Sequence, residues 1–195
     1  YYEFIYAKYL YVFAYKFEND VFYQAKVHCA KASNLFIASK NSLHDDIDIL
    51  YAILLRYEGK LNDSVELLKK VLDNQLKHLV PDKTCQTALE LGAIYRELTR
   101  FDDAMTVYEK IENTCSLSAY WNARLKLNTG IILKNRLQLR ISEGNVSFSD
   151  YENYKKTEEF FKFVYHYAKT CDDVLLQLEI QAELIELCAI AQYFQ

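Results

Sequence analysis

Residues 91–111 read LGAIYRELTRFDDAMTVYEKI, and they carry the strongest structural signal in the sequence. Its pattern predicts two helices that cross closely, because Gly92 in the first and Ala104 in the second are small enough for the helix axes to approach. Tyr95 and Tyr108 are large enough to fill the space around that crossing. The stretch therefore predicts one helix pair.

The same pattern recurs upstream in residues 50–72, LYAILLRYEGKLNDSVELLKKVL. Ser64 takes the place of Ala104, 40 residues earlier, and Gly59 falls in the turn between the two helices. The equivalent residues are Ala52, Leu55, Leu61, Ser64 and Leu68 for Gly92, Tyr95, Phe101, Ala104 and Tyr108. Two copies of one helix pair indicate a repeat protein.

Looser copies cover the rest of the chain. Gly130, 38 residues after Gly92, is the small residue of a predicted first helix in LKLNTGIILKNR, residues 125–136. After a polar loop at 143–149, a partner helix is predicted over 151–170. A last amphipathic helix is predicted over 171–195.

At the start of the chain, helices over 1–17 and 21–36 are predicted to form another pair, broken at 18–20. Ala25, Cys29 and Ala32 show the spacing expected of a second helix, so this pair also follows the pattern.

On residues 50–72 and 91–111, the chain resembles the tetratricopeptide-repeat (TPR) superfamily. The resemblance implies an all-α fold: a right-handed superhelix of about four to five helix pairs, whose first helices line a concave groove for a peptide or partner segment. We expect one domain over 1–195, with units near 1–39, 44–80, 82–116, 117–170 and 171–195. The 40-residue offset exceeds the usual repeat of about 34 residues, which places extra residues around 74–83 and a junction at Pro81.

Composition favours a cytoplasmic helical protein. The chain is 51% apolar and has one proline and four glycines, too few for the many turns of a β-sandwich. The net charge of −4 argues against nucleic acid as a partner. Five cysteines without a CxxC pair suit free thiols in a reducing cytosol.

The apolar first helix is interrupted by Glu3, Lys8 and Lys16, which argues against a membrane span. Its aromatic residues go round more than one face. They are Tyr2, Phe4, Tyr6, Tyr9, Tyr11, Phe13 and Tyr15. The chain begins with Tyr1, so we expect part of a larger protein, with a further repeat, a second subunit or a partner covering this helix.

No catalytic constellation is present, and we predict a protein that is not an enzyme and needs no cofactor or metal. His28 and Cys29 are adjacent, but neighbouring residues on a helix point about 100° apart and grip one ion poorly. His44, Asp45 and Asp46 are better explained as a polar helix cap than as a catalytic group. We assign the many tyrosines and phenylalanines to packing rather than to base stacking.

The resemblance also implies which residues face the groove. Arg56, Arg96 and Lys134 stand four residues after the small residue of three successive repeats and would form a row of cations. An apolar strip would run beside them, made of Ile49, Ile53, Leu89, Ala93, Leu127 and Ile131. Alternatively, the cations are solvated helix ends or form internal salt bridges, with Glu58 and Glu97 as partners.

We expect the partner to be a protein or peptide segment of acidic or amphipathic character. TPR proteins that grip a chaperone's terminal carboxylate have asparagine just after the small residue, where this chain has Ile53, Ala93 and Ile131. The leading hypothesis is the recognition or sensor arm of a larger regulatory protein. A self-contained receptor for a signalling peptide, a structural assembly scaffold and an RNA-binding repeat protein are the alternatives.

Overall fold

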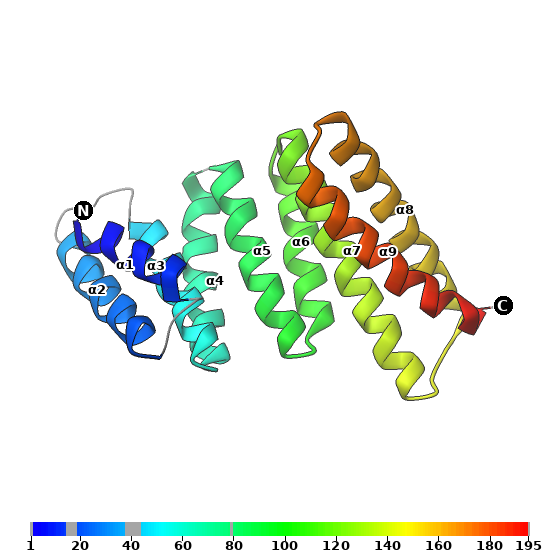
Figure 1. Cartoon of the computed structure of the whole chain (residues 1–195), viewed down its shortest axis with the longest axis horizontal. Coiled ribbons are helices and arrows are strands. Elements are labelled where there is room, and N and C mark those ends of the chain that lie inside the picture. The colour runs from blue at the N-terminus through cyan, green and yellow to red at the C-terminus, as the bar shows by residue number, and fades with distance from the viewer. Residues whose placement is uncertain (1, 15–18, 38–43, 79, 195) are drawn as a thin grey trace. The chain divides into compact units, whose positions relative to one another are not determined.

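The computed structural model describes residues 2–14, 19–37, 44–78 and 80–194 (Figure 1). These residues form nine α-helices and one short 3-10 helix, and they contain no strand. The helices are α1 (Tyr2–Ala14), α2 (Asn19–Ile37), α3 (His44–Tyr57), α4 (Leu61–His78), α5 (Pro81–Glu97), α6 (Phe101–Thr114), α7 (Ala119–Ser142), α8 (Phe148–Thr170), α9 (Val174–Ala191) and η1 (Gln192–Phe194). The predicted all-α class is confirmed.

The helices divide into two compact units, Tyr1–Leu79 with α1–α4 and Val80–Gln195 with α5–α9. The division falls where the sequence predicts a junction, and Pro81 is the first residue of α5. Proline suits that position, because its missing N–H would have no partner within the helix there. The expectation of a single domain stays a prediction.

Small residues bring the helices of the first unit together. Ala25, Cys29 and Ala32 of α2 are fully buried, as their spacing predicts, in one core with α1 and α3. Ser64 of α4 is fully buried too, and its hydroxyl donates to the carbonyl of Ala52 on α3 at 2.7 Å. This hydrogen bond satisfies a polar group that burial would otherwise penalise.

The aromatic first helix is apolar on both sides. Phe4 and Leu10 of α1 are buried, whereas Tyr2 is 73% and Tyr9 is 54% exposed. The side chains of Phe13 and Tyr15 lie outside the described residues. That a partner or another subunit covers the exposed face stays a prediction.

In the second unit, a glycine on one helix faces an aromatic ring on the next helix. A Cβ atom on Gly92 of α5 would lie 2.0 Å from the hydroxyl oxygen of Tyr108 on α6. A Cβ atom on Gly130 of α7 would lie 2.6 Å from a ring carbon of Phe161 on α8. Ala104 is fully buried, so the predicted small positions do lie at helix crossings.

In four turns, the residue two positions after the end of a helix adopts a left-handed backbone conformation. Gly59, Thr99, Gly144 and Asp172 follow α3, α5, α7 and α8, with φ between 53° and 76°. In each turn the following N–H donates to a carbonyl five residues earlier, at 2.8 to 3.0 Å. This bond closes the helix end in the manner of a Schellman turn, so the same local device ends helices in both units.

A capping box fixes the start of α8. The carboxylate of Asp150 accepts hydrogen bonds from the backbone N–H of Ser147 at 2.8 Å and from Arg140 at 3.0 Å. Burial alone would raise the pKa of Asp150, but the hydrogen bonds from Ser147 and the charge of Arg140 outweigh it and lower the pKa. The contact between Arg140 and Asp150 also ties the end of α7 to the start of α8.

Candidate functional site

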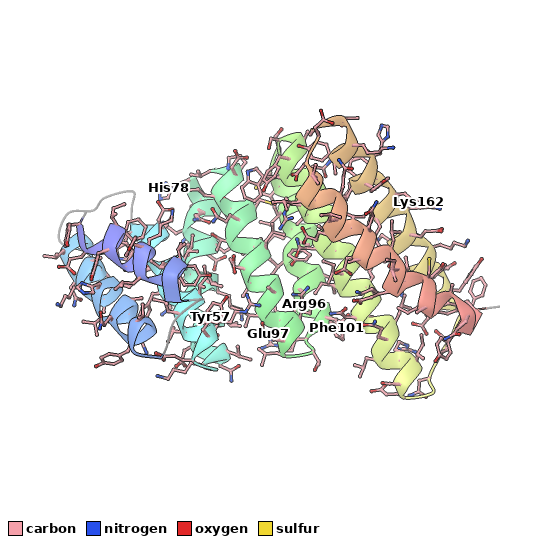
Figure 2. All side chains as sticks on the ribbon, in the orientation of Figure 1. Tyr57, His78, Arg96, Glu97, Phe101 and Lys162 are labelled. Carbon is pink, nitrogen blue, oxygen red and sulfur yellow. The ribbon has the colours of Figure 1, made fainter. Side chains whose placement is uncertain are left out.

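The predicted groove residues on α5 are half-buried along one face of the helix. Leu89, Ala93 and Arg96 each keep part of their surface in solvent. Figure 2 shows Arg96 and Glu97 at the end of α5, close to Phe101 at the start of α6. Three predicted groove residues therefore remain accessible on this helix.

The predicted groove residues on α7 are covered. Leu127 is fully buried and Ile131 is 7% exposed, both in a core that joins α7, α8 and α9. Lys134 is 3% exposed, and its amine binds the carboxylates of Glu183, at 2.5 Å, and Glu186. The alternative of an internal salt bridge thus describes Lys134, but with partners on α9 that the sequence did not suggest.

On α3 of the first unit, Ile49 is buried, while Ile53 and Arg56 are half-buried. Glu58, predicted as a salt-bridge partner, binds Lys26 at 2.6 Å and Lys60 at 3.0 Å. The hydrogen bond from Lys26 is the main reason that the pKa of Glu58 is lowered. Arg56 and Arg96 belong to different units, and their place in one continuous row of cations stays a prediction.

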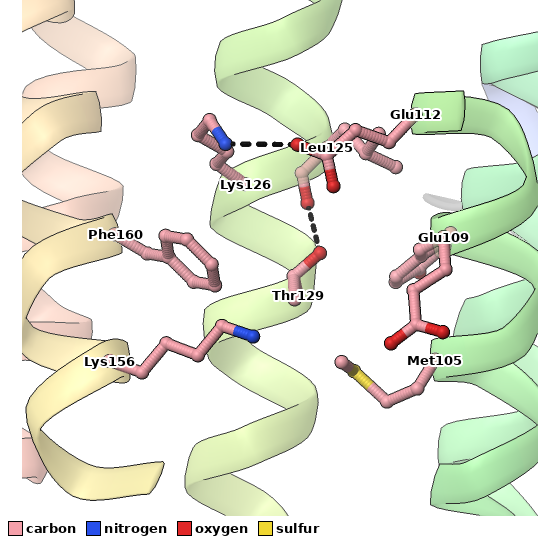
Figure 3. Close-up of a pocket in the computed structure, with 9 residues that line it drawn as sticks. Met105, Glu109, Glu112, Leu125, Lys126, Thr129, Lys156 and Phe160 are labelled. Carbon is pink, nitrogen blue, oxygen red and sulfur yellow. Dashed lines mark hydrogen bonds and ion pairs between the residues drawn. The ribbon is translucent and has the colours of Figure 1, made fainter. Parts of the chain in front are cut away.

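A small pocket opens between α6, α7 and α8 of the second unit (Figure 3). Its volume is about 40 Å³, which is room for the tip of one side chain. The lining residues are Met105, Tyr108, Glu109, Glu112, Leu125, Lys126, Thr129, Lys156 and Phe160. The pocket therefore combines an apolar floor with two cations and two carboxylates.

The two cations of the pocket differ in their partners. Lys126 binds Glu112 at 3.1 Å, whereas within the described residues Lys156 makes no ion pair. Both amines lie over the ring of Phe160, at 5.2 Å for Lys126 and 5.6 Å for Lys156. Figure 3 shows Lys156 on one side of the pocket and Glu109 on the other. Lys156 is thus a cation held beside an aromatic ring without a carboxylate partner.

A wider, open hollow on α8 continues from this pocket and shares Lys156 and Phe160 with it. Its remaining lining residues are Phe148, Tyr151, Glu152, Lys155 and Glu159. Phe148 is 76% exposed, and the amine of Lys155 lies 5.5 Å from the ring centre of Tyr151. We call the pocket and this hollow together the α8 site. It offers alternating aromatic rings and charges of both signs.

The sequence alone does not reveal the α8 site, because it does not distinguish the aromatic residues of this segment that pack inside from those that face outward. Phe161 is fully buried, but Phe160 is half-buried and Phe163 is 45% exposed. The lysines at 155 and 156, one helical turn before Phe160, were the available signal. Only the rotation of α8 about its axis decides which rings face outward.

The residues that resembled metal ligands have structural partners. His28 pairs with Glu3, and the thiol of Cys29 donates to the carbonyl of Ile47 at 3.4 Å. Burial raises the pKa of Cys29 to about 12, which keeps this thiol neutral and unreactive. Within the described residues no three His, Cys, Asp or Glu side chains gather as a metal site, and no helix has the length and apolarity to cross a membrane.

Comparison with solved structures shows that the chain has a TPR-like fold. Two crystal structures from Podosopora anserina, described as kinesin light chain with nearly identical TPR-like repeats, are similar to it. The first, a single-substitution variant, matches with a TM-score of 0.67 at 13% identity, over 96% of this chain and 85% of the other. The second matches with a TM-score of 0.55 at 14% identity, over 97% and 94%.

No protein-family model matches the sequence, and no curated protein matches it. At such low identity the structural similarity establishes the fold alone. The TPR-like fold predicted from residues 50–72 and 91–111 is thereby confirmed.

Proposed function

We propose that this chain is a protein-interaction module and that the α8 site binds a peptide segment. The expected ligand carries an aromatic or apolar anchor flanked by an acidic side chain on one side and a basic one on the other. The observation that carries the proposal is Lys156, which lies over Phe160, lacks a carboxylate partner among the described residues and borders both hollows.

The physical reason is that an acidic side chain reaching Lys156 would meet a charge already positioned by the ring. Phe160 removes part of the water around the amine, and an ion pair strengthens as water is excluded. The small pocket behind it accepts the tip of an apolar side chain between Met105 and Leu125. Charge and anchor together specify the ligand better than either does alone.

Mixed charge favours a peptide over a nucleic acid. Glu109 and Glu112 line the pocket, and Glu152 and Glu159 line the open hollow, so the α8 site has four glutamates and three lysines. A polyphosphate chain laid along this surface would meet these carboxylates and be repelled. A peptide with alternating charges can match them.

A panel of fluorescein-labelled peptides tests this function. Each peptide has a central phenylalanine, flanked by glutamate and lysine in one series, by lysine alone in a second and by glutamine in a third. We expect the mixed-charge series to bind the full chain with Kd in the range of about 1 to 100 μM. Fluorescence anisotropy measures the affinities.

Two variants locate the site. Lys156→Glu should weaken binding of the mixed-charge peptide by about tenfold or more. Lys162→Glu is the matched control, because Lys162 is an exposed lysine of the same helix that pairs with Glu158 and lines neither hollow (Figure 2). Equal binding by the Lys156→Glu and Lys162→Glu chains, or no preference among the three series, would contradict the proposal.

The predicted groove face of α5 is a second candidate site, favoured by the accessibility of Leu89, Ala93 and Arg96. If an acidic or amphipathic segment binds there, its binding should be lost in the Arg96→Glu variant and unaffected in the Lys156→Glu variant. At the level of cellular role, we propose the recognition or sensor arm of a larger regulatory protein. A receptor for a signalling peptide or an assembly scaffold would use the same surfaces.

A further inference from the structure

The outer face of α9 carries an exposed apolar stripe, which we call the α9 seam. Leu175 is 80%, Leu178 58% and Ile185 72% exposed, and Ala182 and Ala189 are exposed too. These residues follow one another at intervals of three and four. With 3.6 residues per turn they fall within an arc of about 80°, which is the geometry of a coiled-coil contact line.

The seam is separate from the face that holds α9 in place. Leu176, Ile180, Leu187 and Ile190 are buried in the core with α7 and α8. From the helical geometry, the centre of this buried face lies about 145° around the helix from the centre of the seam. The helix is therefore apolar on two opposite sides, and its inner packing leaves the seam unused. A helix expected to be amphipathic is in fact apolar on both faces.

One flank of the seam is acidic and the other is uncharged. Glu179 and Glu186 stand on the acidic flank, seven residues apart, and are 42% and 57% exposed at the side chain. With Glu183 they make three carboxylates, which face two cations of α7, Arg124 and Lys134. No Lys, Arg or His occurs between Val174 and Ala191. The flank keeps an excess of negative charge after its internal pairs are formed.

We infer that the α9 seam docks an amphipathic helix of a partner protein that has basic residues along one flank. Its apolar residues would repeat at intervals of three and four, like those of the seam. Its lysines or arginines would stand seven residues apart, matching Glu179 and Glu186. The inference is independent of the α8 site, because none of the seam residues lines that site.

Charge argues against a second copy of this chain as the occupant. Two α9 helices packed antiparallel through their seams would place the acidic flanks against each other, which is repulsive. Packed parallel, each acidic flank would face the neutral flank with Gln181 and Cys188, which provides no cation. A basic partner helix is the occupant that satisfies both the seam and its flank.

Synthetic helical peptides of three heptads test the inference on the full chain. One peptide has leucine along its contact line and lysine along both flanks, and its analogue has glutamate in place of lysine. We expect the lysine peptide to bind at least about tenfold more tightly than the glutamate peptide. The double variant Leu178→Glu/Ile185→Glu should lose about tenfold or more of this binding, with the thermal unfolding midpoint unchanged, since both side chains are exposed.

Control variants separate this inference from the proposed function. Lys156→Glu should leave binding of the lysine peptide unchanged. The double variant Glu179→Gln/Glu186→Gln should reduce the difference in affinity between the lysine peptide and the glutamate peptide. Equal affinity for the two peptides, or undiminished binding by the double glutamate variant, would overturn the inference. So would a dimer in sedimentation velocity that dissociates in the double variant, because the seam would then bind a second copy.

Discussion

Thr99 occupies the left-handed position of the turn between α5 and α6, and replacing it by glycine should stabilise the second unit. Its φ is 55°, whereas the matching positions after α3 and α7 are glycines, with φ of 76° and 70°. A left-handed backbone places Cβ against the following carbonyl at a cost of about 1–2 kcal/mol for a residue other than glycine. Threonine, branched at Cβ, tolerates this conformation poorly.

The net gain follows from two opposing effects. Thr99→Gly removes the steric cost, which raises the free energy of unfolding. Glycine also makes the unfolded chain more flexible, which lowers the free energy of unfolding by about 0.4–1 kcal/mol. Within the described residues, the hydroxyl of Thr99 donates only to the carbonyl of its neighbour Leu98, at 2.7 Å on the exposed surface, so its loss matters little. We expect the free energy of unfolding to rise by about 0.5–1 kcal/mol.

The reverse change in the same unit provides the control. Gly144 follows α7 in the same turn, and a Cβ atom there would meet nothing within 4 Å. Gly144→Thr therefore tests backbone strain without steric crowding and should lower the free energy of unfolding by a similar amount. Urea titration followed by far-ultraviolet circular dichroism measures both variants. If Thr99→Gly destabilises the chain, or if both changes shift stability in the same direction, the assignment of strain to Thr99 is wrong.

Three further outcomes are expected. Gly92→Ala should destabilise by about 1–3 kcal/mol by overpacking against Tyr108, and combining it with Tyr108→Leu in a double-mutant cycle should recover part of that loss. Asp150→Asn should lower stability by about 0.5–2 kcal/mol through loss of the cap. Because folding lowers the pKa of Asp150, its contribution is fully present above the ordinary value of about 3.9 and declines as the pH falls through the lower folded value, so the difference in stability between the two chains in urea titrations should be smaller at pH 3 than at pH 7. Iodoacetamide at neutral pH should modify the exposed Cys188 rapidly and Cys29 only after unfolding, as mass spectrometry of peptides can show.

The helix pairs were predictable because their information is local. The small and aromatic positions of residues 91–111 recur within one repeat, and burial of Ala104, Ser64 and Gly92 follows from helix spacing alone. The partners of Lys134 could not be predicted in this way, since Glu183 and Glu186 lie 49 and 52 residues further along the chain. Their proximity depends on how α9 packs, which no periodicity within α7 records.

The turn at Thr99 shows a different limit. Glycine at 59 and 144 marks the left-handed position directly, because glycine is the residue that adopts it without strain. Threonine at 99 and aspartate at 172 indicate the same conformation less clearly, because threonine disfavours it and aspartate adopts it less readily than glycine does. The repeat alignment, rather than residue preference, is the feature of the sequence that could have located these two turns.

Equivalent positions in a repeat do not have equivalent surroundings, and this explains which cations remain available for binding. Arg96 and Lys134 occupy the same register on α5 and α7, yet Arg96 is half-buried while Lys134 is covered by two carboxylates of α9. Whether a helix buries a cation thus depends on the charges of the later helix that packs against it. Lys156, on α8, is instead held by an aromatic ring. A ring orients an amine without neutralising it, so Lys156 keeps the capacity to recognise an acidic partner that Lys134 has already used within the fold.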